Sequence, residues 1–167
     1  MSGGTGAVVC RFAGKADAAV VGELFYRCDL HYWGDKAPTA EAMAAHVRDT
    51  VLADDAAVEI VLAEEDGEAL GFATFTILYP APDLGGQLYL KDLFVLDRAR
   101  GKGAGLTLMR FLARTALARG CVRFDWTAED NNPEAMAFYA HIGARRVTDK
   151  VYFRFDGAAL KQFAEDG

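Results

Sequence analysis

Two kinds of hydrophobic pattern divide the chain. Short runs rich in β-branched and aromatic residues predict strands over residues 7–13, 56–65, 68–80, 87–96 and 121–128. Between these runs, apolar residues recur every three or four positions, which predicts helices over residues 15–34, 39–54, 104–120 and 132–143. Residues 144–156 read as a closing hairpin, and the residues after it as one helical turn.

The order of these elements predicts one mixed α/β domain over residues 7–167, after a flexible tail over residues 1–6. The strand over residues 87–96 contains few polar residues, as expected when helices cover both faces of a sheet. Residues typical of turns and helix ends mark the boundaries. They are the hairpin pair Asp66-Gly67, the N-caps Asp17, Thr39 and Asn132, and the helix-ending Gly120 and Gly143.

The composition excludes several classes of protein. The chain has 167 residues, of which 52% are hydrophobic and 25% charged, and its formal net charge is −6. These values fit a soluble globular domain, and no apolar run is long enough for a membrane span. The negative charge argues against a nucleic-acid binder and is compatible with a cationic substrate, although most acidic proteins are simply soluble.

Cysteine and histidine give no sign of a metal site. Three cysteines, an odd number, have no metal-ligand spacing, and the three histidines form no metal pattern. The first residues lack the basic region and apolar core of a signal peptide. We therefore expect reduced thiols, a cytoplasmic location and no metal cofactor.

The stretch "RARGKGAG", residues 98–105, lies between a predicted strand and a predicted helix. It is not a P-loop, because Lys102 is followed by glycine instead of serine or threonine. It is not a dinucleotide fingerprint either, because Leu106 occupies the place of the third glycine. The pattern that remains is R-x-x-G-x-G, whose small residues, basic side chains and helix N-terminus suit a diphosphate. A glycine-rich turn with solvated basic residues is the alternative interpretation.

A second stretch, "NNPEAMAFYAHIGA", follows about thirty residues after the first. Together, "YLKDLFVLDRARGKGAG" and this stretch resemble the GNAT superfamily of acetyl-CoA-dependent N-acetyltransferases. Within that superfamily they look most like the diamine (spermidine/spermine-type) and thialysine acetyltransferases. The close resemblance covers residues 88–155. It implies a mixed, mostly antiparallel sheet of six to seven strands, about four helices and a splay between the two central strands.

The resemblance implies acetyl-CoA as cosubstrate and assigns residues to it. Backbone groups over the glycine turn would hold the coenzyme pyrophosphate: Arg100, Gly101, Lys102, Gly103, Ala104 and Gly105. The pantetheine arm would pair with Leu93, Phe94 and Val95 as if it were a strand. A backbone N–H at Leu93 or Phe94 would polarise the thioester carbonyl. Asn132 would hydrogen-bond the coenzyme, cap the helix, or do both.

The resemblance also assigns the catalytic groups. Tyr139 would protonate the departing thiolate; the alternative is an aromatic residue on the packed face of a helix. Where the relatives tend to carry a carboxylate, this chain has Lys91, which would repel a polyamine. Asp92 remains as the group that could take the proton from the amine, or it is the buried partner of a basic residue. Strand alternation puts Lys91 and Asp92 on opposite faces unless a bulge intervenes.

Substrate selectivity is expected in the loop over residues 26–38. Asp29, Tyr32, Trp33 and Asp35 combine aromatic faces with carboxylates, which suits an ammonium group, but a solvated loop with one packed tryptophan is equally compatible. Trp126 and Thr127, at the end of a predicted strand, are possible substrate contacts, although tryptophan is more often a core residue.

The sequence thus predicts an enzyme that acetylates a primary amine of a small molecule, by direct attack in a ternary complex. Two alternatives stay open: a protein or peptide N-acetyltransferase, and a coenzyme A-thioester binding module without catalysis. A pure binding module would need neither Tyr139 nor Asp92. By resemblance to related enzymes, the chain is expected to form a homodimer.

Overall fold

The computed structural model describes residues 6–165. The chain forms two compact units, of which the first ends at Thr127 and the second begins at Ala128. The tail expected over residues 1–6 lies, except for Gly6, outside the described residues. The single domain expected over residues 7–167 stays a prediction.

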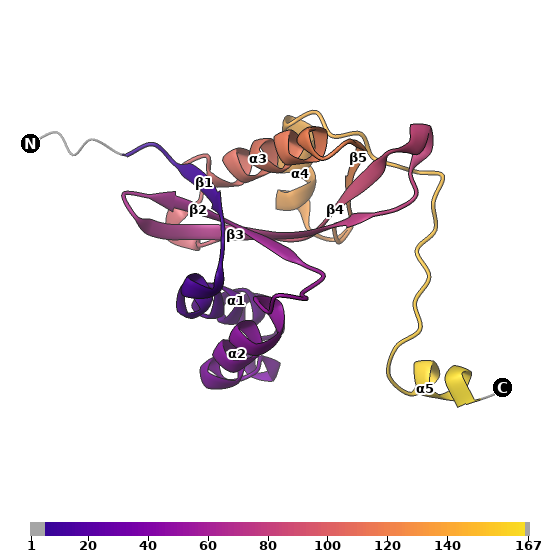
Figure 1. Ribbon diagram of the computed structural model, residues 1–167, viewed down its shortest axis with the longest axis horizontal. Coiled ribbons are helices and arrows are strands. Elements are labelled where there is room, and N and C mark those ends of the chain that lie inside the picture. The colour runs from indigo at the N-terminus through magenta and orange to yellow at the C-terminus, as the bar shows by residue number, and fades with distance from the viewer. Residues whose placement is uncertain (1–5, 166–167) are drawn as a thin grey trace, which may run out of the picture. The chain divides into compact units, whose positions relative to one another are not determined.

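The first unit is built on a five-stranded sheet, whose strands lie in the same order in space as in sequence (Figure 1). The first three pairings are antiparallel, and β4 pairs with β5 in parallel. This is the mixed, mostly antiparallel sheet expected. The strands are β1 (Val9–Phe12), β2 (Glu59–Glu65), β3 (Glu68–Leu78), β4 (Gly86–Val95) and β5 (Cys121–Trp126).

Helices cover both faces of the sheet in the first unit (Figure 1). α1 (Ala18–Trp33) and α2 (Ala40–His46) pack on one face, and one π-helical turn (Val47–Val51) continues α2. α3 (Ala104–Ala118) lies on the other face. The second unit contains α4 (Pro133–His141) and α5 (Gly157–Glu165). The 3₁₀ turns are η1 (Lys15–Asp17), η2 (Gly34–Lys36), η4 (Pro82–Leu84) and η5 (Asp97–Ala99).

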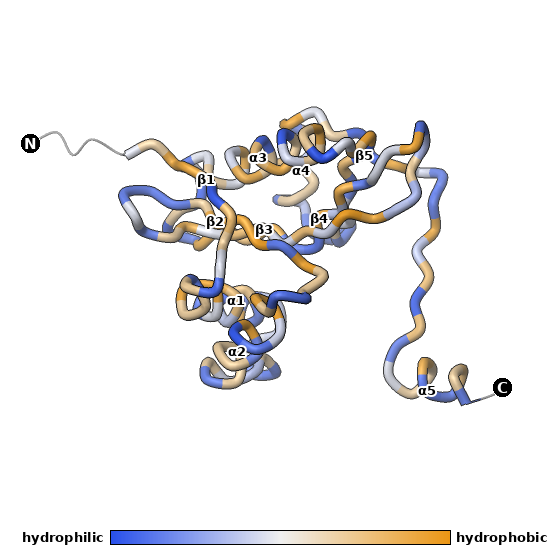
Figure 2. Tube along the Cα trace, in the orientation of Figure 1, coloured by the Kyte–Doolittle hydropathy of each residue, from blue (hydrophilic) through white to orange (hydrophobic). Residues whose placement is uncertain are grey.

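β2 is a nearly continuous apolar run because both of its faces are buried. Ile60 and Leu62 belong to the buried cluster formed with α1 and α2. Val61 and Ala63 are fully buried as well, and strand alternation turns them toward the opposite face, which α3 covers. Figure 2 shows this hydrophobic colouring along the central strands.

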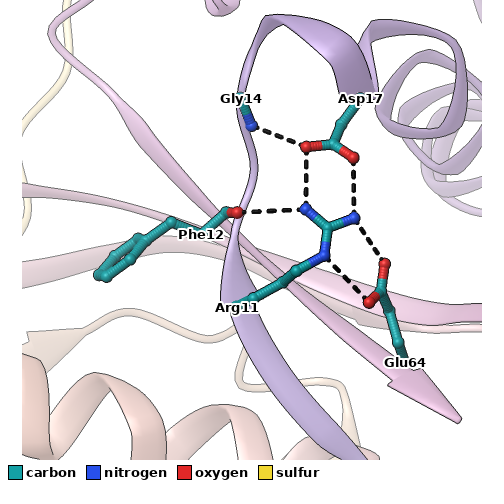
Figure 3. Close-up of polar contacts among 5 residues, drawn as sticks. All are labelled: Arg11, Phe12, Gly14, Asp17 and Glu64. Carbon is teal, nitrogen blue, oxygen red and sulfur yellow. Dashed lines mark hydrogen bonds and ion pairs between the residues drawn. The ribbon is translucent and has the colours of Figure 1, made fainter. Parts of the chain in front are cut away.

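Arg11 joins β1 to β2 and to the start of α1 (Figure 3). Its guanidinium donates to both carboxylate oxygens of Asp17, at 2.9 and 2.8 Å, and to both of Glu64, at 3.0 and 2.7 Å. Asp17 also accepts the Gly14 N–H at 2.8 Å. These contacts, led by the Arg11 hydrogen bond, lower the pKa of Asp17. Asp17 occupies the N-cap position of α1, as expected, but its carboxylate accepts no N–H of that helix and closes the preceding 3₁₀ turn instead.

The other predicted turn and cap residues are confirmed. Thr39 accepts the Ala42 N–H at 3.2 Å, and the caps at Asn132, Gly120 and Gly143 also form. Asp66 and Gly67 join β2 to β3 with φ of 52° and 80°, the left-handed pair that a two-residue hairpin turn requires.

The closing hairpin predicted over residues 144–156 is wrong. These residues contain no strand, so the sheet has five strands within residues 6–165 instead of six to seven. Val151, Tyr152 and Phe153 are all exposed, so this run has no buried face. A strand needs a neighbour for its backbone groups, and a hydrophobic pattern cannot show whether the fold supplies one. The tail instead ends in α5, longer than the single turn expected.

Among residues 6–165, no helix combines the length and apolar character needed to cross a membrane.

Candidate functional site

The glycine turn places a helix N-terminus at the end of β4. After β4 comes the short turn η5, then Arg100–Gly103, then α3. Gly101 and Gly103 have φ of 77° and 84°, which a residue with a side chain adopts only under strain. The first helical hydrogen bond runs from the Thr107 N–H to the Gly103 carbonyl, so the three preceding N–H groups have no acceptor within the helix.

The basic side chains of this turn are already paired with carboxylates. Lys102 Nζ lies 3.0 Å from Glu65 Oε2, and Arg98 lies 2.7 Å from Glu68 Oε1. Arg100 lies 3.1 Å from Asp97. Exposed pairs of this kind are weak, about 0–1 kcal/mol, so an anion could compete for these cations. The backbone N–H groups at the start of α3 are therefore the stronger feature for holding a phosphate.

A β-bulge in β4 brings Lys91 and Asp92 together. Thr74 of β3 is paired with Asp92, but Phe75 is paired with Leu90, so Lys91 is the extra residue. Lys91 Nζ lies 3.7 Å from Asp92 Oδ1, and both side chains are exposed. Regular strand alternation would put these two side chains on opposite faces of the sheet. It does not hold here, because the extra residue in the bulge breaks the alternation.

Thr74 contacts Asp92 twice. The Thr74 hydroxyl donates to Asp92 Oδ2 at 3.0 Å and accepts the Asp92 backbone N–H at 3.1 Å. Thr74 is buried, with 3% of its surface exposed. No pattern in the sequence points to Thr74, because it is one of two threonines in an otherwise apolar strand.

The end of α1 lies in the electrostatic field of Asp92. Burial, with a contribution from Asp92, raises the pKa of Asp29. Burial, with smaller contributions from Asp92 and Asp29, raises the pKa of the Cys28 thiol to about 12. Burial also raises the pKa of Tyr32, to which Cys28 and Asp92 add. Two carboxylates and a phenol therefore gather near the bulge, an arrangement that suits an ammonium group.

The backbone N–H and carbonyl groups of β4 point alternately toward β3 and away from it. The Leu96 N–H donates to the Leu70 carbonyl of β3. Along a strand, backbone groups alternate in direction, so Phe94 also points its N–H and carbonyl toward β3. The N–H groups of Leu93 and Val95 then point away from β3. The parallel ladder with β5 ends at the pair Leu90–Trp126, where β5 itself ends, five residues before the end of β4. The expected splay between the two central strands stays a prediction.

Three further predicted contacts lie in the first unit. Trp126 is paired with Leu90, next to the bulge, and its ring packs 5.0 Å from that of Phe124. The Thr127 hydroxyl lies 3.3 Å from the Tyr89 hydroxyl. Trp33 ends α1 and is 64% exposed, so it is available to a ligand and is not a core tryptophan.

Asn132 and Tyr139 belong to the second unit, where both lie on or next to α4. Asn132 Oδ1 accepts the Ala135 N–H at 3.0 Å, so its role as a helix cap is confirmed. Tyr139 is half-buried, and its ring lies 5.3 Å from that of Phe138. α4 contains no fully buried residue, and both interpretations of Tyr139, as an acid and as a packed aromatic residue, stay open.

The structure thus brings together Asp29, Tyr32, Lys91 and Asp92. Trp126 of β5 is paired with Leu90 of β4, next to the bulge. Within the described part of the chain, no group of three or more histidine, cysteine, aspartate or glutamate side chains could hold a metal ion. Thr74, Glu65 and Glu68 contact predicted site residues and were missed. The sequence alone does not reveal these three residues, because each contact joins residues that lie far apart in the chain.

The chain matches a family model and several known proteins. Residues 20–144 match the acetyltransferase (GNAT) family. The mouse thialysine N-epsilon-acetyltransferase is 31% identical over 98 residues, which are 57% of this chain and 57% of that enzyme. The chain therefore spans little more than half the length of this relative. An aminoglycoside N(6')-acetyltransferase type 1 from Klebsiella aerogenes is 31% identical over 139 residues, covering 78% of this chain and 86% of that enzyme.

A solved structure gives the same fold. An integron cassette protein from the mobile metagenome of V. cholerae superposes with a TM-score of 0.91 at 41% sequence identity. The match covers 96% of this chain and 99% of that protein.

Proposed function

Since the chain belongs to the acetyltransferase (GNAT) family, we propose that it transfers an acetyl group from acetyl-CoA to a primary amine of a small molecule. The observation that carries this proposal is the arrangement of β4 and the segment after it: β4 has a bulge at Lys91, next to Asp92, and after the turn η5 and Arg100–Gly103 comes the N-terminus of α3, which has no side-chain cap. The first feature suits proton removal from an amine, and the second suits a pyrophosphate.

The turn over residues 100–105 fits the phosphates of coenzyme A. Added Cβ atoms at Gly101 and Gly103 would meet no protein atom within 4 Å, so the backbone there is open to a ligand. The N–H groups of Ala104, Gly105 and Leu106 precede the first helical hydrogen bond and supply donors at the positive end of α3. Arg98, Arg100 and Lys102 add positive charge. When bound, acetyl-CoA supplies the activated acetyl thioester.

Leu93 is the residue of β4 that would stabilise negative charge on the thioester oxygen. Its N–H points away from β3, on the side where the ladder with β5 has ended. Phe94, the other candidate, turns its carbonyl toward Gly71 of β3. A fixed backbone donor aimed at a developing oxyanion is a large contribution to catalysis in acyl transfer.

Asp92 would take the proton from the substrate ammonium, directly or through water. A primary amine is protonated at neutral pH and attacks only after losing that proton. Asp29 lies close enough for the two carboxylates to interact, which strengthens attraction for a cation. Lys91, beside Asp92, opposes long polycations, so we propose a small amine over a polyamine.

Tyr139 would protonate the departing thiolate, and Asn132 would hydrogen-bond the coenzyme. The support is the F-Y pair seven residues after Asn132 on α4. Tyr139 is half-buried. No covalent enzyme intermediate is needed, because Asp92 and Tyr139 together account for both proton transfers of a direct attack.

The relatives support a small amine as acceptor. One is named for thialysine and another for aminoglycosides, both of which carry primary amines. An N-acetyltransferase of peptides is the second candidate, and the exposed Tyr32 and Trp33 at the end of α1 are compatible with it. A non-catalytic coenzyme A-thioester binding module is the third.

The test is a panel of acceptors with acetyl-CoA, measured by release of free thiol. The panel holds lysine-like and ornithine-like amines, simple monoamines, spermine, an aminoglycoside and a lysine-containing peptide. We expect saturable release with at least one small amine. Release only with the peptide would move the proposal to the second candidate, and thiol release with none of them would contradict an enzyme.

We also propose a homodimer, located in the cytoplasm. The exposed apolar side chains of Val151, Phe153 and Phe155 suit contact with a second copy. All three cysteines are free thiols, as a reducing compartment requires. Light scattering tests the dimer: Phe153→Asp should lower the measured mass, whereas Leu84→Asp, an equally exposed apolar site elsewhere, should not.

A further inference from the structure

Thr74 forms a two-point contact with one residue across the bulge. Its single hydroxyl donates to Asp92 Oδ2 at 3.0 Å and accepts the Asp92 N–H at 3.1 Å. A hydroxyl has one donor and two acceptor positions, so both contacts can exist together. The register shifts directly after the Thr74–Asp92 pair, between Thr74 and Phe75, and at this point the threonine hydroxyl gives the Asp92 N–H a side-chain acceptor.

This contact fixes which carboxylate oxygen of Asp92 faces the ligand side. Oδ2 is occupied by the Thr74 hydroxyl, while Oδ1 lies 3.7 Å from Lys91 Nζ at the exposed face of the bulge. Thr74 is buried and rigid at χ1 because it is β-branched, whereas Asp92 is 45% exposed in its side chain. Without Thr74, the carboxylate could rotate toward the Lys91 ammonium and lose its orientation.

The charged surroundings of Asp92 make this orientation matter. From α1, Cys28, Asp29 and Tyr32 all interact with it electrostatically. From β4, Lys91 does so as well. Lys91 attracts the carboxylate from the exposed side, so a donor on the opposite side is needed to keep its orientation. The Thr74 hydroxyl supplies that donor from the buried side.

We infer that Thr74 is a positioning residue for the proposed reaction: its hydroxyl holds the Asp92 carboxylate in one orientation, so that Oδ1 receives the proton of the substrate ammonium. The inference rests on the proposed function, and the amine then attacks as the neutral species. Thr74 itself contacts neither the amine nor the thioester, so it acts only through Asp92.

The test compares Thr74→Val, which keeps the shape and removes both hydrogen bonds, with Thr74→Ser, which keeps the hydroxyl. Thr74→Val should lower kcat/KM for the amine by roughly tenfold or more, the usual loss for a hydrogen bond to a charged group. Thr74→Ser should stay within about threefold of the parent enzyme. The KM for acetyl-CoA should not change in either variant.

Two further readouts separate positioning from a merely structural role. The acid limb of the pH profile of kcat/KM should move to higher pH in Thr74→Val, since the ionised carboxylate loses a donor. In an Asp92→Asn background, Thr74→Val should cause no further loss. Thr115→Val is the matched control, because Thr115 is also buried and donates only to the Phe111 carbonyl within α3.

An unchanged pH profile in Thr74→Val, or an equal further loss in the Asp92→Asn background, would overturn the inference. If the parent enzyme acetylates no amine, the proposed function fails, and the inference is decided by carboxyl-carbon NMR. The Asp92 carboxyl should then titrate at higher pH in Thr74→Val than in the parent protein. Identical titration would refute a role for Thr74 in holding the carboxylate.

Discussion

Replacing Gly103 by alanine separates backbone strain from ligand binding at the glycine turn. Gly103 has φ of 84°, and a Cβ added there would meet no protein atom within 4 Å. The methyl group would therefore project into open space, where the coenzyme phosphates are proposed to approach the backbone. Gly120, at the other end of α3, has φ of 70° and equally open surroundings, so Gly120→Ala imposes similar strain away from the ligand.

The magnitudes follow from these two geometries. A side chain in the left-handed region costs about 1–2 kcal/mol, so each variant should lose about 2–8 °C in Tm. Losing close contact with the helix N-terminus removes hydrogen bonds to a charged group, worth about 1.5–3 kcal/mol. Coenzyme A should therefore bind Gly103→Ala at least about tenfold more weakly. Gly120→Ala should bind it like the parent protein.

Titration calorimetry with coenzyme A and thermal melts of the three proteins decide the question. Both variants must remain folded at the titration temperature, which the melts establish. Unchanged affinity in Gly103→Ala would mean that the phosphates lie elsewhere. An equal loss of affinity in Gly120→Ala would mean that strain in α3, and not contact at the turn, weakens binding.

Three further changes test other residues. Tyr139→Phe should lower kcat by roughly 10²–10³ with little change in the KM for acetyl-CoA. The control Tyr152→Phe, at an exposed position, should not lower kcat. Full turnover in Tyr139→Phe would show that Tyr139 is not the general acid. Lys91→Glu should improve kcat/KM for spermine relative to a monoamine by about three- to tenfold, whereas the exposed Lys150→Glu should leave the ratio unchanged. Cys28→Ala should keep turnover within about threefold, because a thiol with a pKa of about 12 is almost fully protonated at neutral pH; abolished turnover would point to a covalent route.

The raised pKa of Cys28 also predicts a pH dependence of stability. The thiol of the unfolded chain loses its proton near its ordinary value of 9.0, while the folded protein retains it to about 12. The folded state thus binds more protons than the unfolded state between pH 9 and pH 12. The free energy of unfolding therefore falls as pH rises from 9 toward 12, and below pH 9 this thiol gives it no pH dependence. Urea denaturation of the parent protein and Cys28→Ala should show a smaller loss between these pH values in the variant.

The glycine turn and most element positions could be predicted from the sequence because they depend on local chemistry. Gly101 and Gly103 take left-handed conformations that other residues avoid, and Thr39 and Asn132 cap their helices through nearby backbone groups. Asp17 stands at the N-cap position of α1, but its carboxylate binds Arg11, which lies on a strand, and the Gly14 N–H instead of a helix N–H.

The candidate site was predictable only in part, because its geometry depends on pairings across the sheet. The bulge at Lys91 arises from the register between β3 and β4, and alternation alone gave the wrong relation between Lys91 and Asp92. Register likewise brings Thr74 to Asp92, eighteen residues away in sequence. The hairpin expected over residues 144–156 shows the same limit, since its residues have strand-like composition but form no strand.

The most direct measurement follows the acetyl group itself. The protein is incubated with acetyl-CoA labelled in its acetyl group and with the small amine that gives the highest thiol release, and the products are separated by mass spectrometry. The account predicts that the label appears on the primary amine nitrogen in an amount equal to the thiol released, with no labelled protein at any time. Label recovered as free acetate, or as a stable adduct on the protein, would contradict transfer by direct attack of a small amine.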